Sequence, residues 1–554
     1  MNDPIDQLDR VDGAIAALCG IGALAAYVRT MAPDLLYGDS AELQTLAHTL
    51  GHTHSTGYPI YLLLAHLVGS LPLHTPAWRV TLFSALSAAS AVAGVYLLSR
   101  MLTNSRTGAV VACVGLALSY TLWAQAIIAE VYAPGAAFLA WILLLVLRWH
   151  RNPEGRAGSL FAAALLAGTS PGVHATTALA ALPAAGFVLL RLIHQRPSRM
   201  EWRRALLAGG GGAILGVALW LAAFLYIDWH DPPSSFINTT LAPSRSIWGL
   251  AAEDMDSPME RISLTVSSAQ WRDVLFAGGM RAAWASLVDD LGRIVRREFS
   301  GWFLLLGSYG WWVSLRRSPW EGGFLLASFL FVFLPVLNYD PGGRHVFFLS
   351  TYIPCAAVAG VGMGALIEAS ARWKLLAERG WGPLAAVVTA LAVAAGVVTP
   401  VFDARLSAIR TGVARFVTER YQFPVKDLRE PRRQAEMRLG ALPDDALVLM
   451  KWRDLHAVAY LAHVEAKKPS LLLVEAMPRG HHGRVAASMI ETIRQALTEG
   501  RSVYAAQRFP GLEDHFTLAP AGGGYVEVLP KESPCPSDSI SRCVGKPELR
   551  GFRP

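Results

Sequence analysis

The chain has 554 residues, of which 53% are hydrophobic and only 16% are charged. Soluble domains carry about 25% charged residues, so this composition excludes an ordinary soluble protein and is typical of a membrane protein. The net charge of +7 could indicate a nucleic-acid partner. The basic residues cluster between apolar runs, however, as they do in cytoplasmic membrane loops, so we expect no nucleic acid to bind.

Long apolar runs fill residues 1–400. A helix needs about 20 apolar residues to cross the hydrocarbon core of a bilayer, and the runs predict about eleven such helices. They lie at roughly 13–32, 79–98, 107–127, 133–148, 157–170, 174–190, 205–226, 301–314, 322–337, 346–368 and 382–400. The run Gly57–Leu73 could also span, but it carries Pro59, His66 and Pro72. An interfacial or re-entrant segment is the preferred interpretation.

The loops between these runs form two alternating sets. One set is rich in cations, and the positive-inside rule places it in the cytoplasm. It contains Arg100, Arg106, Arg148, Arg151, Arg156, Arg191, Arg196, Arg199, Arg203, Arg204, Arg316, Arg317, Arg372, Lys374 and Arg379. The other set comprises 33–78, the turns near 130 and 172, the long loop 227–300, the turn 338–345 and the tail 401–554. We therefore expect a multi-pass protein of a bacterial inner membrane, with this second set outside.

The composition of the chain changes after Pro400, where charged residues become frequent. Strand-like runs at 446–451, 470–475 and 502–506 alternate with helical patterns at 454–466 and 483–499. Such alternation predicts a small α/β domain over 401–554, following the transmembrane domain 1–400. Cys535 and Cys543 near its end could form a disulfide if this domain faces an oxidising compartment.

Two carboxylates lie in the first outer loop. Asp39 and Glu42 have the spacing of a helix N-cap with its reciprocal glutamate, which is the structural interpretation. Ionisable groups at a membrane rim are also often functional, and a capping carboxylate could still accept a proton. The nearby pair His52 and His54 could suggest a metal, but spacing by two suits a strand, and this stretch reads as helix end and loop. We expect no metal there.

Further polar and aromatic residues gather on the same predicted side of the membrane. They are Tyr58, Glu130, Tyr132, His174, Asp231, Asp340, Arg344 and His345. A solvated loop acid is the alternative for Glu130, and a snorkelling interfacial anchor is the alternative for Arg344. The inner loops are merely basic, so an active site on the outer face is the simplest account.

The motifs around these residues resemble a known family. Tyr37-Gly38-Asp39-Ser40-Ala41-Glu42-Leu43, followed by His54-x-x-Gly57-Tyr58-Pro59-Ile60-Tyr61, is similar to the signature of the transmembrane protein O-mannosyltransferases. The run from Trp123 to Tyr132 is similar to that family's W-x-Q-x-x-x-x-E-V-Y element. Asp228-Trp229-His230-Asp231-Pro232 resembles its W-G-D-P box with His230 in place of glycine, and Val173-His174 its N-H element with valine in place of asparagine. The likeness covers most of 30–350 and, weakly, Trp452 to Glu475.

The resemblance implies a membrane glycosyltransferase of the GT-C type, an all-α polytopic bundle with a small C-terminal α/β domain. Such enzymes use a polyprenyl-phosphate sugar as co-substrate, without a further cofactor, on the non-cytoplasmic face. Asp39 matches the position of the catalytic base, with Glu42 beside it. A protein or surface-glycan hydroxyl would be the acceptor, mannose or a related hexose the sugar, and inversion the outcome. Arg344 and His345 are candidates to stabilise the leaving phosphate.

Two other classes of function compete with this prediction. A transporter or lipid-glycan flippase would show internal repeats and polar residues at the bilayer midplane. Here the polar residues gather at one face, and the sequence shows no repeat. A non-catalytic membrane anchor with a partner-binding tail would leave Asp39, Glu42 and Glu130 without a role.

Overall fold

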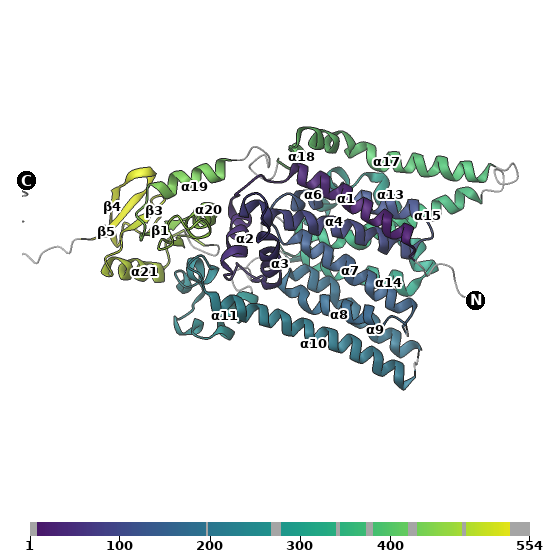
Figure 1. The fold of residues 1–554 in the computed structure, drawn as a ribbon, viewed down its shortest axis with the longest axis horizontal. Coiled ribbons are helices and arrows are strands. Elements are labelled where there is room, and N and C mark those ends of the chain that lie inside the picture. Colours follow the sequence, from purple (N-terminus) through teal and green to yellow (C-terminus); the bar gives the residue numbers. More distant parts are fainter. Residues whose placement is uncertain are drawn as a thin grey trace, which may run out of the picture.

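The structure is a computed structural model. It describes residues 8–153, 155–195, 198–267, 279–339, 344–372, 381–418, 429–478 and 483–531. Within these ranges the chain forms a bundle of long apolar helices with a small sheet-containing domain at one end (Figure 1). This arrangement confirms the predicted polytopic bundle with a C-terminal α/β domain.

Eight helical segments of the described residues are long and apolar enough to cross a membrane. They are α1 (Arg10–Thr30), α4 (Pro76–Leu102), α7 (Tyr132–Arg151), α9 (Ala175–Gln195), α10 (Arg199–His230), α14 (Pro319–Leu337), the segment Arg344–Ala371 with α15 (Leu349–Ala371), and the first part of α17 (Gly382–Thr411). A ninth span is possible if α5 (Arg106–Ala117) and α6 (Tyr120–Ala126), which are bent by 62° at their junction, count as one. The chain is thus a multi-pass membrane protein.

By length and composition the described residues contain eight such helices, or nine with the bent pair, beside the roughly eleven that the sequence predicts. The predicted runs 157–170 and 301–314 do form helices, α8 (Ala157–Thr169) and α13 (Gly301–Arg317), but they have only 13 and 17 residues. The ambiguous run after Gly57 forms α3 (Pro59–Gly69), whose 11 residues cover about 16 Å at 1.5 Å per residue. It is too short to cross, in agreement with the interfacial or re-entrant interpretation.

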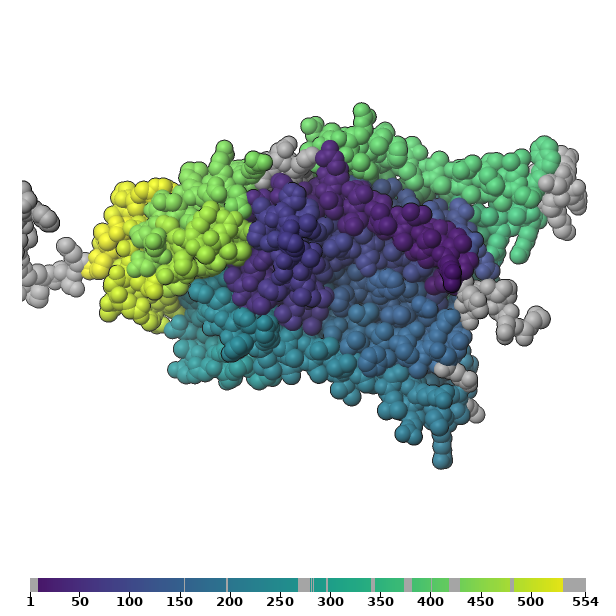
Figure 2. Space-filling model, viewed as in Figure 1, coloured from purple at the N-terminus to yellow at the C-terminus, as the bar shows by residue number. Residues whose placement is uncertain are grey.

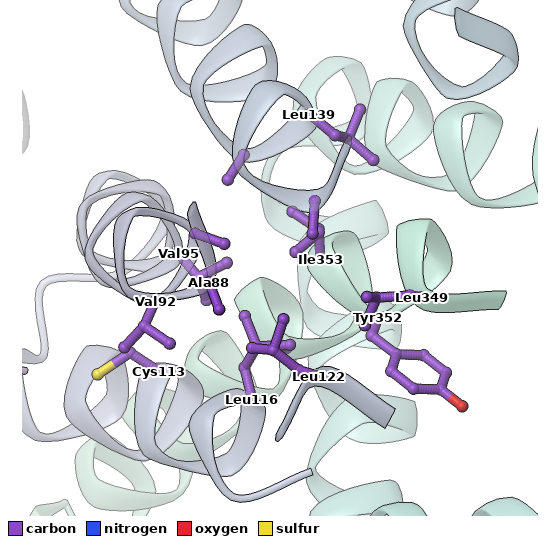
Figure 3. Packing of buried hydrophobic residues seen from close by; sticks show 14 of the residues in the cluster. Ala88, Val92, Val95, Cys113, Leu116, Leu122, Leu139, Leu349, Tyr352 and Ile353 are labelled. Atoms are coloured by element: carbon purple, nitrogen blue, oxygen red, sulfur yellow. The ribbon is translucent and has the colours of Figure 1, made fainter. Parts of the chain in front are cut away.

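The core of the bundle lies where α4, α5, α7 and α15 meet. Ala88, Val92 and Val95 of α4 face Leu116 of α5 and Ile353 of α15 in one tightly packed cluster (Figure 3). Small residues allow this close approach, as is usual between membrane helices.

The predicted outer segments gather at the end of the bundle opposite the N-terminus (Figure 1). The first outer loop forms α2 (Gly38–Thr49) and α3. The long outer loop forms η3 (Ile237–Leu241), η4 (Arg245–Trp248), η5 (Glu253–Met255), α11 (Pro258–Val266), α12 (Gly279–Arg293) and η7 (Ile294–Glu298). Two short helices, η2 (Ser170–Gly172) and η8 (Arg344–Phe348), precede α9 and α15.

The C-terminal domain contains a five-stranded sheet with the order β2-β1-β3-β5-β4. Its parallel part consists of β2 (Leu472–Glu475), β1 (Leu447–Met450) and β3 (Val503–Ala505), at the three predicted runs. Helices α20 (Trp452–Ala459), continued by η9 (Tyr460–Val464), and α21 (Ala487–Thr498) match the two predicted helices. The antiparallel strands β4 (Phe516–Pro520) and β5 (Val526–Pro530), with η10 (Gly522–Gly524) between them, were not predicted, nor were α18 (Arg415–Thr418) and α19 (Glu430–Gly440).

This domain sits directly on the outer loops. Arg432 of α19 forms an ion pair with Asp34, and the Tyr460 hydroxyl accepts a 3.0 Å hydrogen bond from the Ala77 amide. Ser246 and Ser488 join the long outer loop to α21 at 3.0 Å. Figure 2 shows one continuous surface from the domain over the first and the long outer loops. Cys535 and Cys543 lie outside the described residues, so their disulfide stays a prediction.

Candidate functional site at the outer end of the bundle

Helix α2 carries the two acids of the first outer loop. The helix is capped at Tyr37 without a side-chain hydrogen bond, and Asp39 lies in its first turn. The N-cap interpretation of Asp39 was therefore wrong by two residues. Asp39 is exposed, whereas Glu42, one turn later on the same face, is fully buried. The helix start favours the negative charge of Asp39 through its free amides and dipole.

Glu42 binds the loop that follows α2 and does not close a cap. One of its oxygens accepts a 2.7 Å hydrogen bond from the backbone amide of His54, and the other lies 2.5 Å from His54 Nδ1. Burial alone would lower the pKa of His54, but the charge of Glu42 and its hydrogen bond raise it to about 9. Burial raises the pKa of Glu42, and the charge of His54 opposes that shift. At neutral pH the pair holds a proton between the buried Glu42 and the partly exposed His54.

The C-terminal domain contributes two residues to the same place. Trp452 Nε1 donates a 2.6 Å hydrogen bond to Asp39 Oδ1. Glu475 is buried at the end of β2, accepts a 3.0 Å bond from the Thr240 hydroxyl and is within electrostatic range of Asp39 and Glu42. Burial raises the pKa of Glu475 to about 7; the Thr240 bond opposes the shift, and the two carboxylates add to it.

These two residues meet because of sheet geometry. Strands β1 and β2 are parallel and paired in register, with Met450 opposite Glu475. Strands β1 and β2 therefore end at the same edge of the sheet, and Trp452 follows the last residue of β1 by two positions. The available sequence signal was the pair of predicted strand-like runs in an α/β domain, since functional residues often follow the carboxyl ends of the strands in such domains. Sequence reasoning assigned no role to either residue.

Glu130 completes the acidic group from the other side. It lies between α6 and α7, where its backbone amide and carbonyl both bond the Ser84 hydroxyl, at 3.1 and 3.2 Å. Burial, together with the charge of Asp39, raises the pKa of Glu130 to about 8, and the charge of His54 opposes the shift. Asp39, Glu42, Glu130 and Glu475 thus all lie within electrostatic range of His54, and we call these five residues the acidic cluster. No group of His, Cys, Asp or Glu side chains among the described residues is arranged to hold a metal ion.

Aromatic rings lead from the acidic cluster toward the bundle. His54 contacts Trp452 and Tyr58 edge to face, at 5.8 and 5.4 Å between ring centroids. Tyr58 stacks on His174 at 6.0 Å, and His174 lies 4.7 Å from Tyr132. Burial lowers the pKa of His174 to about 3, so its ring is neutral. His54, Tyr58, His174 and Tyr132 were singled out in the sequence, and the structure brings them together from the loop before α3, the start of α7 and the turn before α9.

The remaining predicted residues are not members of the acidic cluster, and one of them lies outside the described residues. Asp231 is exposed after α10 and accepts a 2.8 Å bond from Asn238. Arg344 faces α12, where its Nε lies 3.1 Å from Asp290 and its Nη1 donates to Ser286 at 3.0 Å. His345 is buried on η8. Asp340 falls outside the described residues.

Comparison with solved structures identifies the class of fold. The chain superposes on ArnT from Cupriavidus metallidurans bound to undecaprenyl phosphate, with a TM-score of 0.56 and 12% identity over 93% of this chain and 98% of that one. It also superposes on the apo oligosaccharyltransferase of Archaeoglobus fulgidus, with a TM-score of 0.50 and 14% identity over 89% of this chain and 69% of that one. The fold is the GT-C fold, as the motifs implied.

Sequence comparison is more specific. Residues 39–198 match the family model described as the Protein O-mannosyl-transferase TMEM260 N-terminal domain, which confirms the resemblance seen in the motifs. The mouse Protein O-mannosyl-transferase TMEM260 is 25% identical over 84% of this chain. The chain spans 62% of that relative's length. A Dictyostelium discoideum relative of the same name is 26% identical over 24% of this chain and 16% of its own.

Proposed function

We propose that the protein transfers a sugar from a polyprenyl-phosphate donor to a hydroxyl group on the non-cytoplasmic face of its membrane. The observation that carries this proposal is the exposed carboxylate of Asp39, which a tryptophan from a separate domain holds at the rim of the bundle. The GT-C fold and the family match of residues 39–198 support the same class of reaction.

In this mechanism Asp39 is the general base. It takes the proton of the acceptor hydroxyl while the hydroxyl oxygen bonds to the anomeric carbon, and the bond from that carbon to the phosphate oxygen breaks. Attack from the face opposite the phosphate inverts the anomeric centre. The buried Glu42–His54 pair fixes the loop and the field around Asp39. The lipid phosphate leaves with the electron pair, and it needs positive charge at that moment.

Arg344 is the candidate for stabilising that phosphate. Its Nε and Nη1 are engaged by Asp290 and Ser286, which would hold the guanidinium in one orientation at the outer end of α15. Arginine binds phosphate with high geometric specificity. His345, next to it, is the second candidate. No cofactor enters this scheme, because the lipid-linked sugar is a co-substrate.

The finer parts of the proposal concern the substrates and the compartment. Mannose or a related hexose is the proposed sugar, and a protein hydroxyl or a surface glycan is the proposed acceptor. The curated relatives named Protein O-mannosyl-transferase support this choice. A bacterial inner membrane is the proposed location, although the named relatives come from mouse and Dictyostelium.

The direct test uses purified full-length protein with radiolabelled polyprenyl-phosphate mannose and, separately, polyprenyl-phosphate glucose. We expect release of polyprenyl phosphate together with labelled acceptor from one of these donors. If folded, monodisperse protein releases no polyprenyl phosphate from either donor, the proposal is contradicted. ATP-independent movement of intact lipid-linked sugar across vesicles, without release, would favour the flippase alternative.

A further inference from the structure

The loop from Gly51 to Gly57 joins α2 to α3 and carries His54, the partner of Glu42. Three points of this loop press against the end of α10 and the segment that follows it. A Cβ atom on Gly51 would lie 2.7 Å from Pro232, and one on Gly57 would lie 2.6 Å from Phe224. Between them, the His52 carbonyl accepts a 2.7 Å hydrogen bond from the Phe236 amide. The loop is therefore shaped by a surface outside the acidic cluster.

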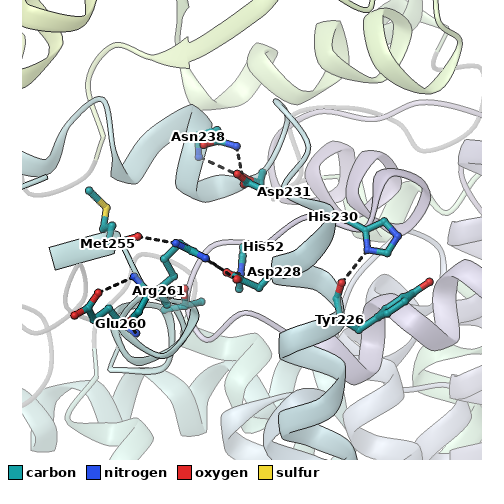
Figure 4. A network of polar contacts seen from close by, with 12 residues as sticks. His52, Tyr226, Asp228, His230, Asp231, Asn238, Met255, Glu260 and Arg261 are labelled. Carbon is teal, nitrogen blue, oxygen red and sulfur yellow. Dashed lines mark hydrogen bonds and ion pairs between the residues drawn. The ribbon is translucent and has the colours of Figure 1, made fainter. Parts of the chain in front are cut away.

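The middle attachment is reinforced by a buried charge network (Figure 4). Asp228, near the end of α10, accepts a 2.9 Å bond from His52 Nε2. Arg261 of α11 grips the same carboxylate with two bonds of 2.7 Å, from Nε and from Nη2. A third nitrogen of Arg261 donates to the carbonyls of Met255 and Asp256, at 2.7 and 3.0 Å. The guanidinium is thus fixed in one orientation, and it fixes Asp228 in turn.

His52 and His54 leave the loop toward opposite partners. His52 is 1% exposed, stacks on Phe224 at 5.9 Å and reaches Asp228, whereas His54 reaches Glu42. A movement of the loop at His52 would shift the His54 amide and ring, which together make both bonds to Glu42. The same outer segment also carries Thr240, the hydrogen-bond donor to Glu475. It therefore contacts the acidic cluster directly at Glu475 and indirectly through His52.

We propose that Asp228 and Arg261 are positioning residues for the reaction, acting through His52 on the His54–Glu42 pair. This inference rests on the proposed function for its catalytic half. Its structural half, that the Asp228–Arg261 pair holds the 51–57 loop in place, stands on the contacts alone. A bidentate pair suits this role, because it resists rotation as well as separation.

The test combines two readouts on full-length protein in the same detergent. Hydrogen–deuterium exchange reports the order of peptides covering 51–57, and donor turnover reports kcat and KM. The variants are Arg261→Ala, Arg261→Lys and Asp228→Asn. Arg508→Ala is the matched control, because Arg508 forms a 2.6 Å ion pair with Glu513 that is exposed on the C-terminal domain.

We expect Arg261→Ala to speed exchange of the loop amides, and to lower kcat by about tenfold to a hundredfold with little change in the donor KM, as for other misplacements of about 1 Å. Arg261→Lys, which keeps the charge but not the fork, should fall between wild type and Arg261→Ala in both readouts. The Arg508→Ala control should match wild type in both.

Loop exchange equal to that of wild type in Arg261→Ala and Arg261→Lys would overturn the proposal. Faster exchange at an unchanged kcat would overturn its catalytic half. A wild-type protein that transfers no sugar contradicts the proposed function instead. The exchange measurement needs no substrate, and it still decides whether Arg261 holds the loop.

Discussion

Single side chains set the electrostatic character of the outer end. Four carboxylates lie around His54, and burial or mutual repulsion raises the pKa of three of them, Glu42, Glu130 and Glu475. Like charges in a shared site cannot all ionise, so protons are retained there near neutral pH. Asp39 differs because it is exposed and bonded by the Trp452 indole. It is the member of the cluster best placed to meet an acceptor from solution.

The Glu42–His54 pair gives stability a definite dependence on pH. The pKa of His54 is raised from 6.5 to about 9 in the folded protein. Its contribution is therefore fully present below pH 6.5 and disappears as pH rises through 9. We expect wild type to unfold at a higher temperature than His54→Gln at pH 6, with the gap closing by pH 9.5. Thermal unfolding followed across this range checks it, and a gap that widens with pH would show that the pair is not charged as described.

Glu130 should function as a neutral group. Its pKa is raised to about 8, so it is protonated at pH 7 and becomes charged as pH rises above 8. If the protonated carboxyl of Glu130 donates a hydrogen bond to the substrate, the amide of Glu130→Gln can replace it as a neutral donor of the same shape. We expect the transfer rate of this variant at pH 7 to stay within about tenfold of wild type, which corresponds to a change of at most about 1.4 kcal/mol in activation free energy. We expect the wild-type rate to decline above pH 8 and the rate of Glu130→Gln to show no such decline. The transfer rates of wild type and Glu130→Gln, measured as a function of pH, test this prediction. A Glu130→Gln variant that is inactive at every pH would show that the reaction requires the ionised carboxylate of Glu130.

Helices and strands could be predicted from the sequence where they contain long apolar runs or a strongly periodic pattern. Every predicted span coincides with a helix or with the pair α5 and α6, and at least one of its bounds agrees to within a few residues. Three strands and two helices of the C-terminal domain also lie where they were predicted. The antiparallel strands β4 and β5 were not predicted because each ends in proline, which weakens a strand pattern. Helix α2 begins two residues earlier than the cap signal of Asp39 indicated, because the chain turns at Tyr37 and Gly38.

Helix packing depends on particular glycines, and α13 offers a matched pair. A Cβ atom on Gly310 would lie 1.8 Å from the Val358 carbonyl oxygen of α15, whereas one on Gly307 meets nothing within 4 Å. We expect Gly310→Ala to lower thermal stability and the yield of monodisperse protein, with a cost of about 1–3 kcal/mol typical of overpacking. Gly307→Ala should match wild type in the same detergent. Equal behaviour of the two variants would contradict the close contact of α13 with α15.

Trp452 tests whether the C-terminal domain contributes to the reaction as an element. Trp452→Phe keeps an aromatic ring against His54 but removes the hydrogen bond to Asp39. A bond to a charged group is worth about 1.5–3 kcal/mol, so we expect kcat to fall by about tenfold or more. Arg508→Ala in the same domain is the control. A Trp452→Phe protein with wild-type kcat would leave the hydrogen bond from Trp452 to Asp39 without a part in catalysis.

The whole molecule assembles its candidate site from parts far apart in the chain. Asp39 and Glu42 come from the first outer loop, Glu130 from a later turn, and Trp452 and Glu475 from the C-terminal domain. The motifs of the first loop could be read from the sequence because they are local. The approach of Trp452 to Asp39 could not, because it depends on how the domain seats on α2, which no local pattern encodes.

Membrane orientation is the prediction at this scale. The arginine-rich loops are expected in the cytoplasm and the C-terminal domain outside. A single cysteine at Arg203 or at Arg484, both exposed, should distinguish the two sides in an otherwise cysteine-free chain. We expect a membrane-impermeant thiol reagent to label the Arg484→Cys protein in intact cells and the Arg203→Cys protein only after permeabilisation. The reverse pattern would place the acidic cluster on the cytoplasmic side and remove the basis for a lipid-linked donor from the outer leaflet.

The most direct measurement is the transfer rate of Asp39→Asn with the donor that wild type uses. Asparagine keeps the size of the side chain and an oxygen that can accept the Trp452 hydrogen bond, but it cannot take a proton. Loss of a general base costs about 10²–10⁴ in rate, so the account predicts a fall of that size in folded protein with an unchanged elution profile. Transfer by Asp39→Asn at the wild-type rate would contradict it, because Asp39 would then be only a surface carboxylate at the start of α2.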